Sequence, residues 1–223
     1  RLSKSILTVS SFCKNSFTKR MSERSLILGN PFDEKLLIGK KEKSKKNNEI
    51  RKKYNISKKN KVITFVGSKN LQKRHNIFFD IVMKLNNLKA SKFYFLFVGN
   101  FDGSEEIFKE FKKINYLIIN NKFNLKEFYT ISDLVISPGV DEGFGRTIIE
   151  SMMTRSCILA SDSGGHKELI TEGFNGFLSK KDNVDDFLKK ILSIFSNKNH
   201  KKVNQIKDNA FEYVKKKYKL ETY

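Results

Sequence analysis

The segment LVISPGVDEGFGRTIIESMMT (residues 134–154) decides the fold, because its hydrophobic pattern changes from one period to another. Its start, Leu134–Ser137, is a short apolar run typical of a strand covered by helices on both faces. A glycine-rich stretch follows, and Thr147–Thr154 then has the amphipathic pattern of a helix. A strand, a glycine-rich loop and a helix form the repeating unit of α/β proteins.

The same alternation continues on both sides of this segment. The predicted strands are Ser5–Val9, Ser25–Leu28, Lys61–Val66, Lys92–Val98, Tyr116–Ile119, Leu134–Ser137 and Ser156–Ala160. The predicted helices are Arg74–Leu88, Ser104–Lys113, Leu125–Ile131 and Thr147–Thr154, with two long amphipathic helices near Asp182–Phe195 and His200–Lys217. Alternating strands and helices indicate an α/β fold with a doubly wound, Rossmann-like parallel sheet.

Four predicted strands end in small residues. The stretches that follow them are Gly67-Ser68, Gly99-Asn100, Pro138-Gly139 and Asp162-Ser163-Gly164-Gly165. A glycine after one strand is ordinary turn chemistry. Four together favour a ligand crevice, because ligands of open α/β sheets bind outside the carboxyl ends of the strands.

The chain is strongly basic, with 44 Lys and Arg against 24 Asp and Glu and a formal net charge of +20. Between Lys40 and Lys61 there are 11 basic residues and 2 acidic ones. Such a run is usually a solvated linker, although a membrane-facing patch and a nucleic-acid contact are alternatives. RNA-binding signatures and zinc-ligand spacings are absent, which argues against nucleic acid.

Cysteine content and hydropathy indicate the cellular compartment in which the protein is expected. The sequence has only Cys13 and Cys157, so no disulfide framework is expected and a reducing compartment is favoured. It shows neither a signal peptide nor an apolar run long enough to span a bilayer. We expect a cytoplasmic protein, with peripheral contact to the membrane as an open possibility.

The loop before the predicted helix at 147 has the residues of an anion site. Gly143 and Gly145 allow close approach of a ligand to the backbone, and the first amides of a helix attract a diphosphate. Glu142 and Glu150 could hold sugar or ribose hydroxyls, or stabilise a developing positive charge at an anomeric carbon. The candidate cations for the diphosphate are Lys73, Arg74 and Arg146.

Five motifs occur together in one order between about residues 60 and 200. They are Phe65-Val66-Gly67-Ser68 with Lys73-Arg74, Val135-Ile136-Ser137-Pro138, Glu142-Gly143-Phe144-Gly145 with Glu150, the block from Ala160 to Ile170, and Asn175-Gly176-Phe177-Leu178. As a set they resemble the retaining glycosyltransferases of the GT-B fold, of the family 4 type known as glycosyl transferases group 1. The resemblance lies in the C-terminal, donor-binding domain. Ser68 stands where the family often has Arg, so either Lys69 or Arg74 substitutes for it or the phosphate is held less tightly.

The resemblance implies a role for each matching residue. Glu142 would be the catalytic carboxylate beside the donor sugar, and Glu150 would bind the ribose hydroxyls. The remaining donor-binding residues would be Gly67, Ser68, Lys73, Arg74, Lys122, Phe123, Gly143, Phe144, Gly145, Arg146 and Thr147, with Lys122 and Phe123 near the base. The donor would be a UDP-, GDP- or ADP-sugar, and neither a cofactor nor a metal is expected.

The resemblance also implies a division of the chain. Residues 1–30 would be a remnant of an N-terminal acceptor domain with the crossover, 31–60 a basic linker, 61–200 the nucleotide-sugar-binding domain and 201–223 a truncated C-terminal helix. The family transfers a hexose-type sugar to a glycan or lipid-linked acceptor with retention of configuration, as in polysaccharide biosynthesis. We expect this fragment to be inactive by itself. The alternative is a non-catalytic nucleotide-sugar-binding module that works with a separate subunit.

Overall fold

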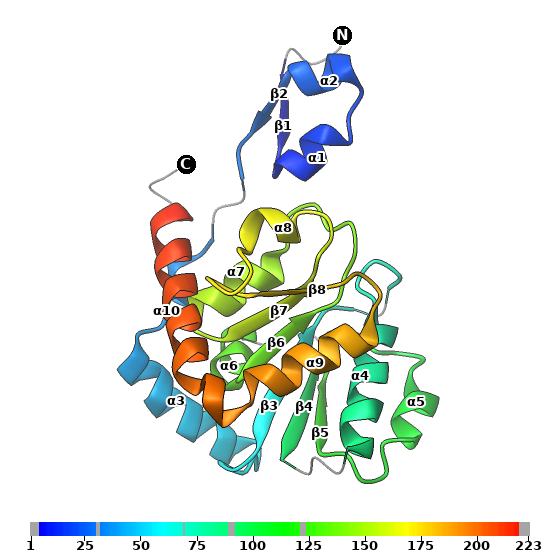
Figure 1. Ribbon diagram of the computed structural model, residues 1–223, viewed down its shortest axis with the longest axis vertical. Coiled ribbons are helices and arrows are strands. Elements are labelled where there is room, and N and C mark those ends of the chain that lie inside the picture. The colour runs from blue at the N-terminus through cyan, green and yellow to red at the C-terminus, as the bar shows by residue number, and fades with distance from the viewer. Residues whose placement is uncertain (1–4, 30–31, 69, 89–91, 121–123, 219–223) are drawn as a thin grey trace.

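A computed structural model describes residues 5–29, 32–68, 70–88, 92–120 and 124–218. At its centre is a six-stranded parallel sheet in the order β5-β4-β3-β6-β7-β8 (Figure 1). The strands are β3 (Lys61–Val66), β4 (Phe93–Val98), β5 (Tyr116–Ile119), β6 (Leu134–Ser137), β7 (Cys157–Ser161) and β8 (Phe177–Ser179). The predicted α/β fold with a doubly wound parallel sheet is therefore confirmed. Strand β8 was not predicted, because three residues are too few for a hydrophobic period to show.

Helices cover both faces of the sheet, and side chains alternate between the two cores. Along β3, Ile63 and Phe65 face one core, whereas Val62 faces the other. The first core is covered by α4 (His75–Asn87), α5 (Glu105–Lys109) and α9 (Val184–Ile194). The second is covered by α6 (Leu125–Ile131), α7 (Arg146–Met153), α8 (His166–Leu169) and α10 (His200–Lys217). Helix α5 is shorter than the predicted Ser104–Lys113.

The N-terminal residues form a small unit of their own. Strand β1 (Ile6–Thr8) pairs in parallel with β2 (Ser25–Ile27), and α1 (Ser11–Asn15) and α2 (Lys19–Glu23) connect them. This unit lies beyond α8, next to loops at the carboxyl ends of the central strands (Figure 1). None of the helices in the described ranges has both the length and the apolar composition needed to cross a bilayer.

The predicted basic linker is wrong for much of its length. Residues 31–60 contain a short 3-10 turn, η1 (Glu34–Leu36), and the helix α3 (Lys40–Lys53), which packs against α6. Ile50 is the only apolar residue within α3, so no amphipathic pattern marks it as a helix. Polar contacts hold it instead: the buried Arg51 reaches Asp133 at 2.9 Å and donates to three backbone carbonyls.

Candidate functional site

The loops after β3 and β4 approach each other closely at the carboxyl edge of the sheet. A Cβ atom at Gly99 would lie 2.2 Å from the carbonyl oxygen of Gly67, and Gly99 has a φ of +140°. Only glycine meets both conditions. The side chain of Lys73 passes over Gly67, with its Cδ 3.3 Å from where a Cβ would be. Lys73 thus lies beside Gly67 and the adjacent Ser68, the residues that the resemblance assigns to a phosphate-binding loop.

Glu142 is the centre of the candidate site. Its carboxylate is 9% exposed and pairs with Nζ of Lys73 at 2.9 Å. Nε2 of the buried His166 lies 3.8 Å from its other oxygen. Burial raises the pKa of Glu142, but the nearby His166 and Lys73 outweigh burial, so the pKa lies below its ordinary value. The carboxylate is therefore held charged in a largely enclosed position.

Glu150 occupies a second buried position, one turn into α7. It accepts a hydrogen bond of 2.8 Å from the hydroxyl of Tyr129 in α6 and one of 3.2 Å from the exposed Arg146. Burial and the charge of Glu150 raise the pKa of Tyr129 well above its usual range, so the phenol remains a donor. Glu150 and Glu142 thus have different partners, which is consistent with two different roles.

Helix α7 begins at Arg146, four residues after Glu142 and four residues before Glu150. Gly145 is the N-cap residue, with a φ of +80° and no side-chain cap, so the first amides of the helix have no capping side chain. Such amides carry partial positive charge and suit an anion. Thr147 is buried at the start of the helix. The predicted cluster of Gly143, Gly145 and Thr147 is therefore assembled around one helix terminus.

Two predicted donor-binding side chains have other contacts. The ring of Phe144 stacks on Phe32, with ring centroids 6.1 Å apart, and contacts Tyr218 edge-on, with centroids 5.8 Å apart. Phe144 therefore packs against other aromatic rings. Arg74 is the residue before α4, has a φ of +52° and pairs with Asp182 at 2.9 Å. Lys122 and Phe123, predicted to lie near the base, are outside the described residues.

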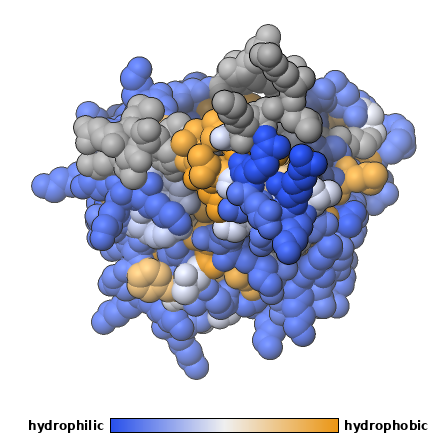
Figure 2. All heavy atoms as spheres, turned by 90° about the horizontal axis from the view of Figure 1, so that it is seen from above, coloured by the Kyte–Doolittle hydropathy of each residue, from blue (hydrophilic) through white to orange (hydrophobic). Residues whose placement is uncertain are grey.

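The N-terminal unit touches the same loops. The Ser10 hydroxyl donates to the carbonyl of Gly143, and the amides of Ser11 and Phe12 donate to the Glu168 carboxylate at 3.0 and 2.5 Å. A cavity of about 300 Å³ lies between this unit, Phe144 and the C-terminal helix. On the face seen from above, apolar surface adjoins strongly hydrophilic surface (Figure 2). The N-terminal unit therefore forms one wall of this cavity, the second wall, beside the glycine-rich loop.

Sequence reasoning missed four of these contributions. Tyr129 is one of two aromatic residues in an amphipathic helix and carries no local signal of its role. His166 lies in the block from Ala160 to Ile170, and the sequence does not show that its ring faces Glu142. Ser10 and Glu168 meet only in three dimensions. Within the described ranges, no cluster of three or more His, Cys, Asp or Glu could hold a metal ion; metal independence stays a prediction.

Comparison with known proteins adds independent information. Residues 46–213 match the model of the family described as glycosyl transferases group 1. An uncharacterized glycosyltransferase of Methanocaldococcus jannaschii is 26% identical over 223 residues, covering 95% of this chain and 54% of the relative. The chain thus spans about half the length of this curated relative.

Solved structures share the fold at low identity. HepE of Anabaena, in a crystal structure with UDP-glucose, has a TM-score of 0.82 at 20% identity, covering 100% of this chain and 62% of that one. The C-terminal domain of the group 1 protein LpcC from Francisella tularensis has a TM-score of 0.69 at 20% identity, covering 85% of this chain and 99% of that one. The match to an isolated C-terminal domain agrees with the Rossmann-like half of a GT-B enzyme.

Proposed function

The chain belongs to the glycosyl transferases group 1 family, and from this premise we propose that it forms the donor side of a retaining, family 4 type hexosyltransferase. The observation that carries the proposal is the pair of buried carboxylates, Glu142 and Glu150, which flank the uncapped N-terminus of α7 along the chain. A UDP-, GDP- or ADP-sugar has matching chemistry, with a diphosphate between two sets of hydroxyl groups.

Each residue has a distinct role in this proposal. The α7 amides and Lys73 bind the diphosphate, and Arg146 adds positive charge at the mouth of the site. Glu150, oriented by Tyr129, accepts hydrogen bonds from the ribose hydroxyls. Glu142 faces the sugar near its anomeric carbon and stabilises the positive charge that develops there. Lys73 and the helix terminus neutralise the leaving diphosphate, so the reaction needs no metal or other cofactor.

The acceptor side is proposed from the family. A glycan or lipid-linked acceptor would enter opposite the glycine-rich loop, where the N-terminal unit begins the second wall. Transfer would retain the anomeric configuration by attack from the face that the nucleotide leaves. We place the enzyme in the cytoplasm, with peripheral contact to the membrane where the acceptor is lipid-linked.

Calorimetric titration with UDP-, GDP- and ADP-hexoses tests the donor site. We expect binding of one of these donors and a loss of affinity of about tenfold or more in Glu150→Gln, because a neutral amide cannot replace a charged acceptor. Glu106→Gln, an exposed glutamate of α5, is the matched control and should leave affinity unchanged. Absence of heat with every nucleotide sugar would overturn the proposal.

A further inference from the structure

We propose that a second anion site, in the cavity between α3 and α10, binds a small molecule that carries two or more phosphate groups. The cavity measures about 460 Å³ and shares no lining residue with the donor site. Among the residues that the structure describes, four cations line it, Lys40, Lys43, Arg155 and Lys207, together with one carboxylate, Asp208. The other lining residues are one serine and three asparagines.

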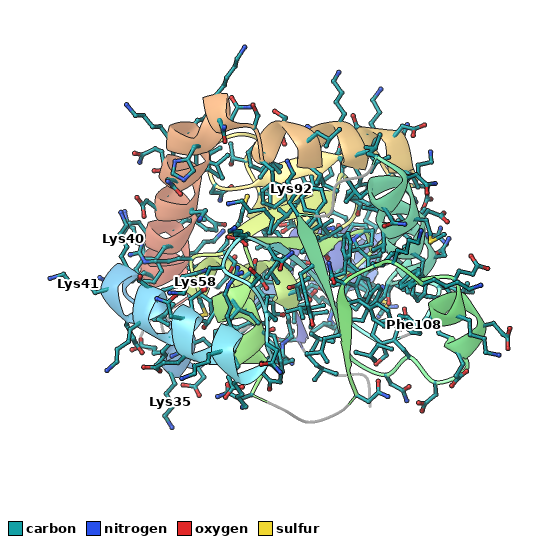
Figure 3. All side chains as sticks on the ribbon, turned by 90° about the horizontal axis from the view of Figure 1, so that it is seen from below. Lys35, Lys40, Lys41, Lys58, Lys92 and Phe108 are labelled. Carbon is teal, nitrogen blue, oxygen red and sulfur yellow. The ribbon has the colours of Figure 1, made fainter. Side chains whose placement is uncertain are left out.

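The cavity lies at the opposite end of the sheet from the glycine-rich loop. Lys43 of α3 donates to the Thr154 carbonyl and the Ser156 hydroxyl, just before β7 begins at Cys157. Lys40 is at the end of α3 that lies beside α10, as the view from below shows (Figure 3). A ligand here would therefore be far from the carboxyl ends of the strands, where the donor is proposed to bind.

Positive charge in the cavity is only partly neutralised. Asp208 is shared between Lys40 at 2.6 Å and Arg155 at 2.8 Å. Within the described part of the chain, Lys43 and Lys207 form no ion pair of 4.0 Å or less, and Lys207 has only a 3.4 Å contact to Asn204. The lining residues have a formal net charge of +3, and Glu212, which is not one of them, lies 3.9 Å from Arg155.

Lys43 retains a donor for a ligand. Its ammonium carries three N–H groups, and two are used, at 2.8 Å to the Thr154 carbonyl and 2.9 Å to the Ser156 hydroxyl. Burial and the charge of Lys207 lower the pKa of Lys43 well below its usual range. An anion bound between Lys43 and Lys207 would offset the repulsion between their positive charges. The electrostatics of the site therefore favour binding of an anion.

The lining also selects the ligand class. The volume falls within the range of about 300–1,000 Å³ that is usual for small-molecule sites. No aromatic or aliphatic side chain lines it among the described residues, so a nucleobase or acyl chain has nothing to pack against. Ammonium groups suit phosphate oxygens, and the asparagine amides suit hydroxyl groups. A polyol with several phosphates, either free or as a lipid headgroup, meets these requirements.

Calorimetry with myo-inositol 1,4,5-trisphosphate at about 0.15 M salt tests the soluble form of this chemistry. Sedimentation with vesicles of phosphatidylcholine, with and without phosphatidylinositol 4,5-bisphosphate, tests the headgroup form. We expect at least one of these two probes to bind. Its affinity should fall about tenfold or more in Lys207→Ala, because a charge-assisted contact is lost. Lys207 makes one weak contact, so this variant should fold normally, as circular dichroism would verify.

Two further variants identify the site. Lys201→Ala removes an exposed lysine from the same helix and should bind as the parent does. Lys73→Ala alters the donor loop and should also bind unchanged, which separates this proposal from the proposed donor site. The inference is overturned if neither probe binds, if Lys201→Ala weakens binding as much as Lys207→Ala, or if only Lys73→Ala abolishes it.

Discussion

Nε2 of His166 lies 3.8 Å from Oε1 of Glu142, and in the described part of the chain both atoms are buried without a hydrogen-bond partner. The other ring nitrogen, Nδ1, lies 3.1 Å from the carbonyl oxygen of Ser161. A carbonyl can only accept, so Nδ1 carries a proton. Nε2 then faces the carboxylate either as a lone pair, which repels it, or as a second N–H, which attracts it. The imidazole therefore positions Glu142 most strongly when it carries both protons.

Replacing His166 with Asn tests this relationship. The amide can still donate to the Ser161 carbonyl but is too short to reach Glu142. Because His166 helps to lower the pKa of Glu142, we expect that pKa to rise in the variant. A depressed carboxyl pKa contributes stability above the unfolded value and loses it as pH falls through the folded value. The ordinary pKa of Glu is 4.5. In urea unfolding near and below this pH, the variant should lose stability at a higher pH than the parent protein does.

The matched control for this experiment is His200→Asn, an exposed histidine at the start of α10. Its pH dependence of unfolding should follow the parent protein. Donor affinity measured over the same pH range should weaken at a higher pH in His166→Asn than in the parent. Superimposable profiles for the two variants would mean that His166 does not act on Glu142.

Gly139→Ala should damage the donor site while leaving the fold intact. A Cβ at this position would lie 2.2 Å from Oε1 of Glu142, so the carboxylate must move away from Lys73. We expect about a tenfold or greater loss of nucleotide-sugar affinity by calorimetry, the effect of weakening one charge-assisted contact. Gly39→Ala is the control, because a Cβ there meets nothing within 4 Å. Unchanged affinity in Gly139→Ala would show that Glu142 does not contact the donor.

Tyr129→Phe should destabilise the protein by leaving one oxygen of the buried Glu150 without its donor. The expected decrease in the free energy of unfolding is about 1–3 kcal/mol, measured by urea titration. Donor affinity should fall as well, since Glu150 loses the group that orients it. Tyr94→Phe is the control: its hydroxyl forms no hydrogen bond in the described ranges, and the substitution should change stability little. Equal stability of the two variants would contradict the role given to Tyr129.

The sheet and the position of the two glutamates were predictable from sequence for a physical reason. Strands buried on both faces are apolar along their whole length, and glycines mark where the backbone must approach a neighbour closely, as at Gly99. The spacing of Glu142 and Glu150 is local. The partners of these glutamates are not local: Tyr129 is 21 residues from Glu150, and the direction of the His166 ring depends on how α8 packs.

Helix α3 is the clearest case of structure that local pattern does not reveal. Lysine and glutamate are good helix formers, but they are also common in solvated linkers. Their presence therefore does not distinguish a helix from a linker. The decisive contacts come from Arg51, whose partners include the carbonyl of Ile131 and the carboxylate of Asp133, about eighty residues further along the chain. A polar anchor of this kind leaves no hydrophobic period in the sequence, so only the folded structure identifies it.

Arg51→Ala should therefore lower the free energy of unfolding more than any substitution on the exposed side of α3. The substitution leaves Asp133 with the Val62 amide as its remaining described donor and leaves the carbonyls of Ser57, Asn60 and Ile131 without this partner. Arg51 is buried but the Asp133 side chain is 31% exposed, so we expect a loss of about 3 kcal/mol, the lower end of the range for breaking a buried ion pair. Alanine is the better helix former, so propensity cannot account for such a loss. In urea titrations, Lys52→Ala, the exposed neighbour, should stay close to the parent. A loss below about 1 kcal/mol in Arg51→Ala, the range of exposed pairs, would show that α3 is held by something other than this arginine.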